Sequence, residues 1–223
     1  MQKLDLSKFF PNTHREKIYN FFLKKLKMKP DVAKLITDFT TVNFKDSFNV
    51  IETGVNDFVK NKKIRNVNHL PSGTPTSQIL AYLANVDMYD EIIKFTNSQN
   101  LKCSFYVDDI TISSQNPIYS NQIERIKNII SKHGHKLNVK KTIKYGPKEF
   151  KKVTGYVISP EHQLVIPNKT RYKIKKSIRN CKKNKRISRN IKNSILGSIN
   201  FANTSVKGGY DNLDRKLKNL NFK

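Results

Sequence analysis

The chain has 223 residues, of which 37% are hydrophobic and 10% aromatic, so it holds enough apolar material for a folded core and is not disordered throughout. It carries 43 Lys and Arg residues against 17 Asp and Glu, a formal net charge of +26, which makes nucleic acid the first partner to consider. The sequence has no apolar run of about 20 residues and no signal-peptide core, so we expect a cytoplasmic protein without a membrane partner.

The positive charge is unevenly distributed. Residues 161–223 carry 17 basic and 3 acidic residues, whereas residues 1–160 carry 26 and 14. A general lysine bias, or a solvated helical face, would explain many of these residues. It would not concentrate them in one segment, so we expect the C-terminal part to contact a polyanion.

The first third of the chain predicts a strand followed by two helices. "QKLDLSKFF" has strand character from residue 2 onward. Residues 12–28 predict a helix in which Thr13 and Glu16 form a capping box. Residues 31–41 predict a second helix, whose apolar face would be Val32, Leu35, Ile36 and Phe39. Residues 42–69 show no clear pattern.

The middle of the chain predicts a loop, a long helix and a hairpin. "LPSGTPTSQ" is rich in turn residues, and a helix is expected from about Thr76 to Ser98, with Ile79, Leu83, Val86 and Ile93 on its buried face. "LKCSFYV" and "ITISS" then predict two strands, joined by Asp108 and Asp109 as a two-residue turn.

The remaining pattern completes an α+β domain, in which an antiparallel sheet is backed by helices. A helix is expected over 120–133, with short strands around 137–144, 153–158 and 164–166. From residue 168 the pattern is helical and basic. Its expected core is Ile174, Ile178, Ile195, Leu196, Ile199 and Phe201.

The adjacent carboxylates Asp108 and Asp109 have two interpretations. Asp is common in turns, and an isolated pair at a hairpin tip usually needs no other explanation. Here the flanking strands are apolar, so unpaired carboxylates would be costly to desolvate. Asp5 lies in a comparable strand. Three converging carboxylates would form a site for Mg²⁺, with Mn²⁺ as a substitute, and two such ions can drive an in-line displacement at phosphorus.

Five segments resemble, in order, the sequence boxes of reverse transcriptases. They cover roughly residues 3–160 and read "LDLSKFFPNTHREKIYNFF", "HLPSGTPTSQILAYLAN", "FYVDDITIS", "GHKLNVKKT" and "VTGYVISP". A single box is weak evidence, but five in the family's order are specific. The "VTG" and "KLNVKKT" segments and the short basic C-terminus most resemble the bacterial retron type, although its Asn-Ala-x-x-His element is not found in residues 30–69.

The resemblance implies a polymerase palm with its primer grip over residues 1–160 and a basic thumb over 161–223. It assigns both metal ions to Asp5 and Asp108, with Asp109 further out and the Leu6 carbonyl as an additional ligand. Lys141 would donate a proton to the leaving pyrophosphate.

The other implied roles concern the nucleotide and the nucleic acid. The incoming deoxynucleotide would contact Phe10, a steric gate against the ribose 2′-hydroxyl, together with Ser72 and Gly73. Ser72 stands where the family usually has Gln, which shortens that contact. The primer grip would comprise Tyr106, Val107, Thr154 and Gly155. The RNA–DNA duplex would contact Lys175, Lys176, Arg179, Lys182, Lys183 and Arg186.

The implied function is an RNA-directed DNA polymerase of retron type. Such enzymes copy part of a structured noncoding RNA into single-stranded DNA and commonly act in phage defence with an effector protein. The family's fingers region precedes the first catalytic Asp, here residue 5, so we expect fingers to be absent or supplied by a separate chain. The alternatives are a non-catalytic RNA-binding fragment, half of a split enzyme, and an untemplated or protein-primed DNA polymerase.

Overall fold

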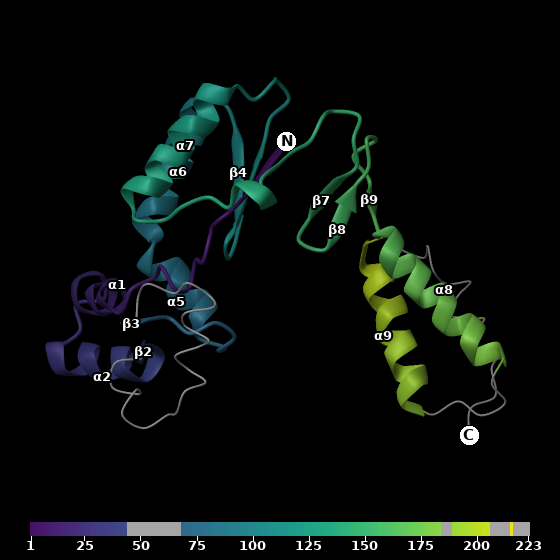
Figure 1. Ribbon diagram of the computed structural model, residues 1–223, viewed down its shortest axis with the longest axis horizontal. Coiled ribbons are helices and arrows are strands. Elements are labelled where there is room, and N and C mark those ends of the chain that lie inside the picture. Colours follow the sequence, from purple (N-terminus) through teal and green to yellow (C-terminus); the bar gives the residue numbers. More distant parts are fainter. Residues whose placement is uncertain (44–67, 184–188, 206–214, 216–223) are drawn as a thin grey trace. The chain divides into compact units, whose positions relative to one another are not determined.

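The computed structural model describes residues 1–43, 68–183, 189–205 and 215, which belong to two compact units, Met1–Lys144 and Tyr145–Lys223 (Figure 1). The division falls before residue 160, so the hairpin that carries Thr154 and Gly155 belongs to the second unit. Most of the unpatterned segment 42–69 lies outside the described residues.

The first unit is built on a four-stranded antiparallel sheet with the order β4-β5-β1-β6. These strands are β1 (Gln2–Asp5), β4 (Lys102–Tyr106), β5 (Asp109–Ser113) and β6 (Ile143–Lys144). Side chains alternate between the two faces of a strand, so Leu4, Ile110 and Ile112 are fully buried on one face. The opposite face carries polar side chains.

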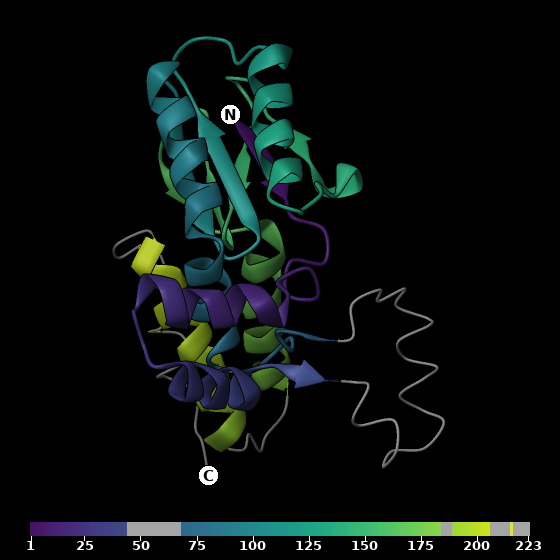
Figure 2. The same ribbon diagram turned by 90° about the vertical axis from the view of Figure 1, so that its left-hand side faces the viewer.

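Two helices cover the apolar face of this sheet. They are α6 (Val86–Ser98) and α7 (Ser120–Lys132), and Figure 2 shows both lying in front of the strands. Met88, Tyr89 and Ile92 of α6 and Ile126 and Ile130 of α7 are fully buried in the core that results. The predicted α+β architecture, an antiparallel sheet backed by helices, is therefore confirmed.

A second group of elements extends the first unit beyond the sheet. It comprises α1 (Arg15–Asn20), the π-helical turn η1 (Phe21–Lys25), α2 (Pro30–Thr40), α5 (Ser77–Ala84) and the strand pair β2 (Val42–Asn43) and β3 (Asn68–His69). The predicted capping box is wrong, because α1 begins only at Arg15. The Thr13 hydroxyl instead donates to the Phe9 carbonyl at 3.0 Å.

Of the four residues predicted to face inward on α2, only Ile36 packs against the core. Val32, Leu35 and Phe39 are exposed, Phe39 by 83%, whereas Ala33 and Thr37 are fully buried. These small side chains allow α2 to lie close to the adjoining helix. The Thr37 hydroxyl is satisfied within α2 by donating to the Ala33 carbonyl at 2.7 Å, so its burial leaves no unpaired polar group.

The long helix expected over 76–98 is two helices that meet at Asn85. The backbone there leaves the helical region (φ −115°, ψ 18°), and the buried Asn85 side chain donates to the Ala81 carbonyl and to the Thr13 hydroxyl. Within α5, Leu80 and Ala81 are buried and Ile79 is exposed, contrary to the predicted stripe, whereas Leu83 packs against the core as predicted.

The second unit contains a three-stranded antiparallel sheet and two helices. The strands are β7 (Lys151–Val153), β8 (Tyr156–Ile158) and β9 (Leu164–Val165), and the helices are α8 (Asn168–Lys183) and α9 (Arg189–Ser205). Four of the predicted helical core residues are buried, namely Ile174, Ile178, Ile195 and Ile199, and Leu196 packs against them. Phe201 is 43% exposed and stacks on Tyr156 instead.

The last differences from the predicted elements concern the segment 137–144. The strand expected around 137–144 is reduced to β6, because Val139–Lys141 form the short 3₁₀ helix η2. Among the described residues, no helix has both the length and the apolar character required to cross a membrane.

Candidate active site

The pairing of β1 with β5 brings the predicted carboxylates to one end of the sheet. Asp5 lies directly opposite Asp109, and the Leu6 amide donates to the Asp108 carbonyl at 2.8 Å. The hairpin turn is Val107–Asp108, with Tyr106 paired to Asp109, so the predicted Asp108–Asp109 turn is wrong by one residue. As a result, Asp108 lies at the tip and Asp109 begins β5.

The turn is held in an uncommon backbone conformation. Val107 has a φ of +55°, in the left-handed region that β-branched residues rarely occupy. Its carbonyl accepts a hydrogen bond from the Tyr89 hydroxyl at 3.0 Å. Burial raises the pKa of the Tyr89 phenol, so this hydroxyl remains a donor. A buried residue of α6 therefore fixes the turn that carries Asp108.

Two lysines form ion pairs with two of the three carboxylates. Lys3 Nζ lies 2.7 Å from Asp109 Oδ2, and the two side chains are only 22% and 19% exposed. Lys141 Nζ lies 3.2 Å from Asp5 Oδ2, with 63% of the lysine side chain exposed and 9% of the aspartate side chain. The Asp5 backbone carbonyl also accepts a hydrogen bond from the Asn138 amide at 2.8 Å.

The electrostatics of the site follow from this crowding. Burial, with smaller contributions from the charges of Asp5 and Asp109, raises the pKa of the Asp108 carboxyl. The hydrogen bond to Asp5 raises the pKa of the Lys141 ammonium, which therefore carries its proton at neutral pH. A cation bound beside Asp108 would offset the repulsion from Asp5 and Asp109, which disfavours the ionised form of the Asp108 carboxyl.

The donor set fits a hard divalent cation. Asp5, Asp108 and Asp109 provide carboxylate oxygens, the ligands that Mg²⁺ prefers. Within the described residues, no group of three His, Cys, Asp or Glu side chains is already gathered as a metal site. The lysine ion pairs are consistent with this, because they direct two of the carboxylates toward ammonium groups.

The residues predicted to bind the nucleotide lie in two places. Phe9 is buried in the core, whereas Phe10 is half-buried, with its ring 5.9 Å from that of Phe9. Ser72 and Gly73 are exposed in the loop before α5. Gly73 has a φ of +91°, a conformation that is strained for any other residue, so the loop requires glycine at this position.

The residues predicted to contact nucleic acid are divided between the two units. Tyr106, opposite Asp109, is 60% exposed in the first unit. Thr154 and Gly155 form the β7–β8 turn of the second unit, both at positive φ. Lys175, Lys176 and Arg179 are exposed on α8. Arg186 and the side chains of Lys182 and Lys183 lie outside the described part.

Sequence reasoning missed Lys3 and Tyr89. Lys3 could have been found from strand periodicity, since it lies two residues before Asp5 and therefore on the same face of β1. The role of Tyr89 had no local signal, because its partner Val107 is 18 residues away and is reached only through the packing of α6 on the sheet.

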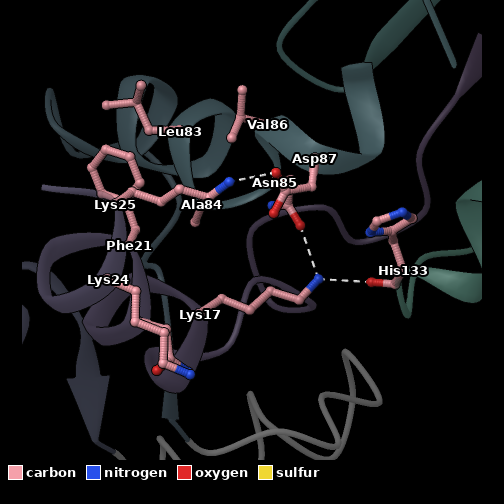
Figure 3. A pocket seen from close by; sticks show the side chains of 11 residues that line it. Lys17, Phe21, Lys24, Lys25, Leu83, Ala84, Asn85, Val86, Asp87 and His133 are labelled. Atoms are coloured by element: carbon pink, nitrogen blue, oxygen red, sulfur yellow. Dashed lines mark hydrogen bonds and ion pairs between the residues drawn. The ribbon is translucent and has the colours of Figure 1, made fainter. Parts of the chain in front are cut away.

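A buried polar network was also missed. Lys17 Nζ donates to Asn85 Oδ1 at 2.9 Å and to the His133 carbonyl at 2.7 Å, and it lies 3.3 Å from His135 Nε2. Figure 3 shows the first two bonds beside a pocket of about 270 Å³. None of the three catalytic candidates Asp5, Asp108 and Asp109 lines this pocket. Because Lys17 is already surrounded by acceptors, the network has a structural role.

Comparison with known proteins shows which family the sequence resembles. The reverse transcriptase (RNA-dependent DNA polymerase) family matches residues 1–158. The retron Ec86 reverse transcriptase of Escherichia coli is 36% identical over 98 residues, which are 42% of this chain and 30% of that protein. The retron Ec48 reverse transcriptase of Escherichia coli is 27% identical over 142 residues, which are 63% of this chain and 29% of that protein.

A solved structure agrees at the level of the fold. A foamy viral protease-reverse transcriptase, determined in complex with an RNA/DNA hybrid, is 15% identical and has a TM-score of 0.51. The match covers 97% of this chain and 23% of that one. The family match covers well over half of the residues and includes all three carboxylates, and on this basis the chain belongs to the reverse transcriptase family.

Proposed function

We propose that this chain is the palm and thumb of a retron-type RNA-directed DNA polymerase. The observation that carries the proposal is the pairing of Asp5 with Asp109, which brings three carboxylates to one end of a palm sheet in a chain of the reverse transcriptase family. The matched parts of the two retron relatives are less than a third of their length. The activity is therefore proposed for this chain and not transferred from them.

The reaction is nucleotidyl transfer from a deoxynucleoside triphosphate to the 3′-hydroxyl of a primer. Asp5 and Asp108 would hold the metal ions, and the Leu6 carbonyl would be a further ligand. When bound, two Mg²⁺ ions supply activation of the 3′-hydroxyl and charge neutralisation on the pyrophosphate leaving group, and Mn²⁺ can substitute. Burial and the charges of Asp5 and Asp109 disfavour the ionised form of Asp108, and a bound cation would offset both effects.

Lys141 acts as the general acid for the leaving group. Its ammonium is hydrogen-bonded to Asp5, and its pKa is raised, so the proton is present when pyrophosphate leaves. The exposure of the Lys141 side chain supports this role, since a mostly solvated lysine can exchange Asp5 for a phosphate oxygen at little cost.

The nucleotide and the primer contact residues around the carboxylates. Phe10 acts as the steric gate that excludes a ribose 2′-hydroxyl, and the half-burial of its ring supports a fixed position. Ser72 and Gly73 contact the incoming nucleotide from the loop before α5. Tyr106 and Val107 support the primer end from the hairpin.

The second unit contributes the remaining contacts to the nucleic acid. Thr154 and Gly155, the primer-grip residues of this unit, contact the primer backbone from the β7–β8 turn. The basic residues of the thumb follow the phosphate backbone of the RNA–DNA duplex, as the exposed lysines and arginine of α8 suggest. They are Lys175, Lys176, Arg179, Lys182, Lys183 and Arg186.

The biological setting follows from the retron type. The template is a structured noncoding RNA in the bacterial cytoplasm, and the single-stranded DNA product acts in antiviral defence with an effector protein. Similarity to two retron reverse transcriptases supports this setting.

Primer extension on an RNA template tests the proposal. With Mg²⁺ and deoxynucleotides, we expect products whose sequence is complementary to the template. Ribonucleotides should be incorporated poorly, and a Phe10→Ala variant should accept them more readily. Products that do not depend on the template sequence would contradict templated synthesis and favour the untemplated polymerase.

A non-catalytic RNA-binding protein is the second candidate. It is favoured by the two ion pairs, which neutralise Asp5 and Asp109 with lysines in place of metal ions. Tight, salt-sensitive RNA binding together with no extension under any divalent ion would support this function over the polymerase.

A further inference from the structure

The ion pair between Lys3 and Asp109 distinguishes Asp109 from the other two carboxylates. Both side chains are about four-fifths shielded from solvent, and the nitrogen–oxygen distance is 2.7 Å. Shielding of this degree reduces the screening of the pair by water and salt. By contrast, the lysine that pairs with Asp5 is mostly exposed. The two ion pairs therefore differ in how easily they open.

The strand register explains why Lys3 reaches Asp109. Lys3 and Asp5 are two residues apart in β1 and share one face, and Asp5 lies opposite Asp109. Lys3 itself lies opposite Thr111, so its side chain crosses diagonally to Asp109, a distance that long side chains span. Lys3 is thus placed by the sheet and not by a mobile loop.

Asp108 has no comparable partner. Among the described residues, no lysine, arginine or histidine lies within ion-pair distance of its carboxylate. Asp108 is therefore available to a metal ion, Asp5 becomes available when Lys141 moves away, and Asp109 is retained by Lys3.

We propose that Lys3 is a positioning residue that keeps Asp109 out of the metal-binding set, an inference that rests on the proposed two-metal function. In the working enzyme, Lys3 remains paired with Asp109 while Asp5 and Asp108 ligate the ions. Lys3 thereby fixes which carboxylates bind metal, and its positive charge sets how tightly they do so.

Loss of the lysine has a specific consequence. In Lys3→Met, Asp109 loses its partner and joins Asp5 and Asp108 as a third ligand. Removal of a cation a few ångströms from the site also removes its repulsion of the metal ion. Divalent affinity should therefore rise on the order of ten-fold, since charges at such distances near a protein surface interact by more than thermal energy. Primer extension should become slower, because the metal ions are ligated differently.

Binding of Mn²⁺, measured by electron paramagnetic resonance on the full 223-residue chain, tests this inference without relying on activity. Lys3→Met should bind Mn²⁺ about ten-fold more tightly than the wild type, and Lys3→Arg should restore affinity close to the wild-type value. Lys102→Met is the matched control. It removes the same charge from an exposed position of β4, at the end of the hairpin away from the turn.

A double-variant cycle separates positioning from charge alone. If Asp109 is the released ligand, Lys3→Met should tighten Mn²⁺ binding much less when Asp109→Asn is also present. Equal tightening in both backgrounds would overturn the positioning role, as would Mn²⁺ affinity in Lys3→Met equal to that of Lys102→Met. If the wild type binds no Mn²⁺ and Asp5→Asn changes nothing, the proposed function fails and the inference fails with it.

Discussion

At the scale of single residues, the site depends on a turn that its own sequence does not favour. Val107 occupies a left-handed conformation that suits glycine or asparagine, and strain of this kind costs about 1–3 kcal/mol. The Tyr89 hydroxyl holds the Val107 carbonyl in place. The hairpin itself was predictable from its alternating apolar pattern. The turn was misplaced by one residue, because Asp-Asp has stronger turn chemistry than Val-Asp and the anchor is distant in sequence.

The first residue-scale prediction concerns that anchor. Tyr89→Phe should lower the free energy of unfolding by about 1 kcal/mol, the usual contribution of one buried hydrogen bond, and should reduce primer extension by more than it reduces RNA binding. Urea unfolding and extension assays measure the two effects. Tyr172→Phe, at an exposed position of α8, is the control and should change neither. Unchanged stability and extension in Tyr89→Phe would contradict a role for this bond.

At the scale of elements, one buried polar network connects three parts of the first unit. Lys17 of α1, Asn85 at the α5–α6 junction and His135 after α7 are mutually hydrogen-bonded or adjacent. The segment after His135 leads to Lys136 and Asn138, whose carbonyl and amide pair with Ser7 and Asp5. The network is therefore connected through this segment to the backbone of Asp5.

The network predicts a specific acid sensitivity. Burial lowers the pKa of the His135 imidazole to about 3, against 6.5 when exposed. Between those values the unfolded chain binds a proton and the folded chain does not. The contribution of His135 to stability is therefore complete above pH 6.5 and is lost as the pH falls toward 3. In that range, the contribution of His135 to the free energy of unfolding should fall by up to about 1.4 kcal/mol for each unit of pH.

Urea unfolding across this pH range, compared with a His135→Gln variant, isolates the effect. The acidic residues titrate in both proteins, so only the difference between the two curves reports His135. The wild type should lose stability more steeply than the variant as the pH falls. Parallel curves would show that the buried imidazole is not held neutral.

The positions of the helices and strands along the sequence were predicted better than the faces that they bury. In β1 and β5, the buried Leu4, Ile110 and Ile112 follow the simple alternation of a strand. On α2, however, the largest apolar residues are exposed, and the helix packs through Ala33 and Thr37. Periodicity favours the most hydrophobic face, whereas close helix packing favours small residues, and the sequence alone does not decide between them. Likewise, the break at Asn85 depends on partners that are distant in sequence, such as Thr13.

At the scale of the whole molecule, the positive charge is carried disproportionately by the C-terminal residues. The triple variant Lys175→Gln, Lys176→Gln and Arg179→Gln should weaken RNA–DNA duplex binding. It should also reduce the slope of log affinity against log salt by about two units, because each phosphate contact contributes roughly 0.7–0.9. Fluorescence anisotropy over a salt series measures both quantities.

The matched control removes three exposed lysines from the first unit, Lys27, Lys29 and Lys34. It makes the same change in net charge, so a reduction in slope as large as that of the α8 variant would indicate a general charge effect. That result would contradict a specific duplex contact along α8. A slope change confined to the α8 variant would support the proposed thumb.

Asp5 and Asp108 are proposed to form a catalytic metal site in a polymerase palm. The most direct measurement is RNA-templated primer extension by Asp108→Asn, with RNA binding determined on the same samples and Asp90→Asn, an exposed position of α6, as the control. Extension should fall by more than about 100-fold in Asp108→Asn, since even indirect partners of a metal ligand contribute 10–100-fold, while RNA binding and the control remain unchanged. Extension by Asp108→Asn at the wild-type rate would contradict the claim.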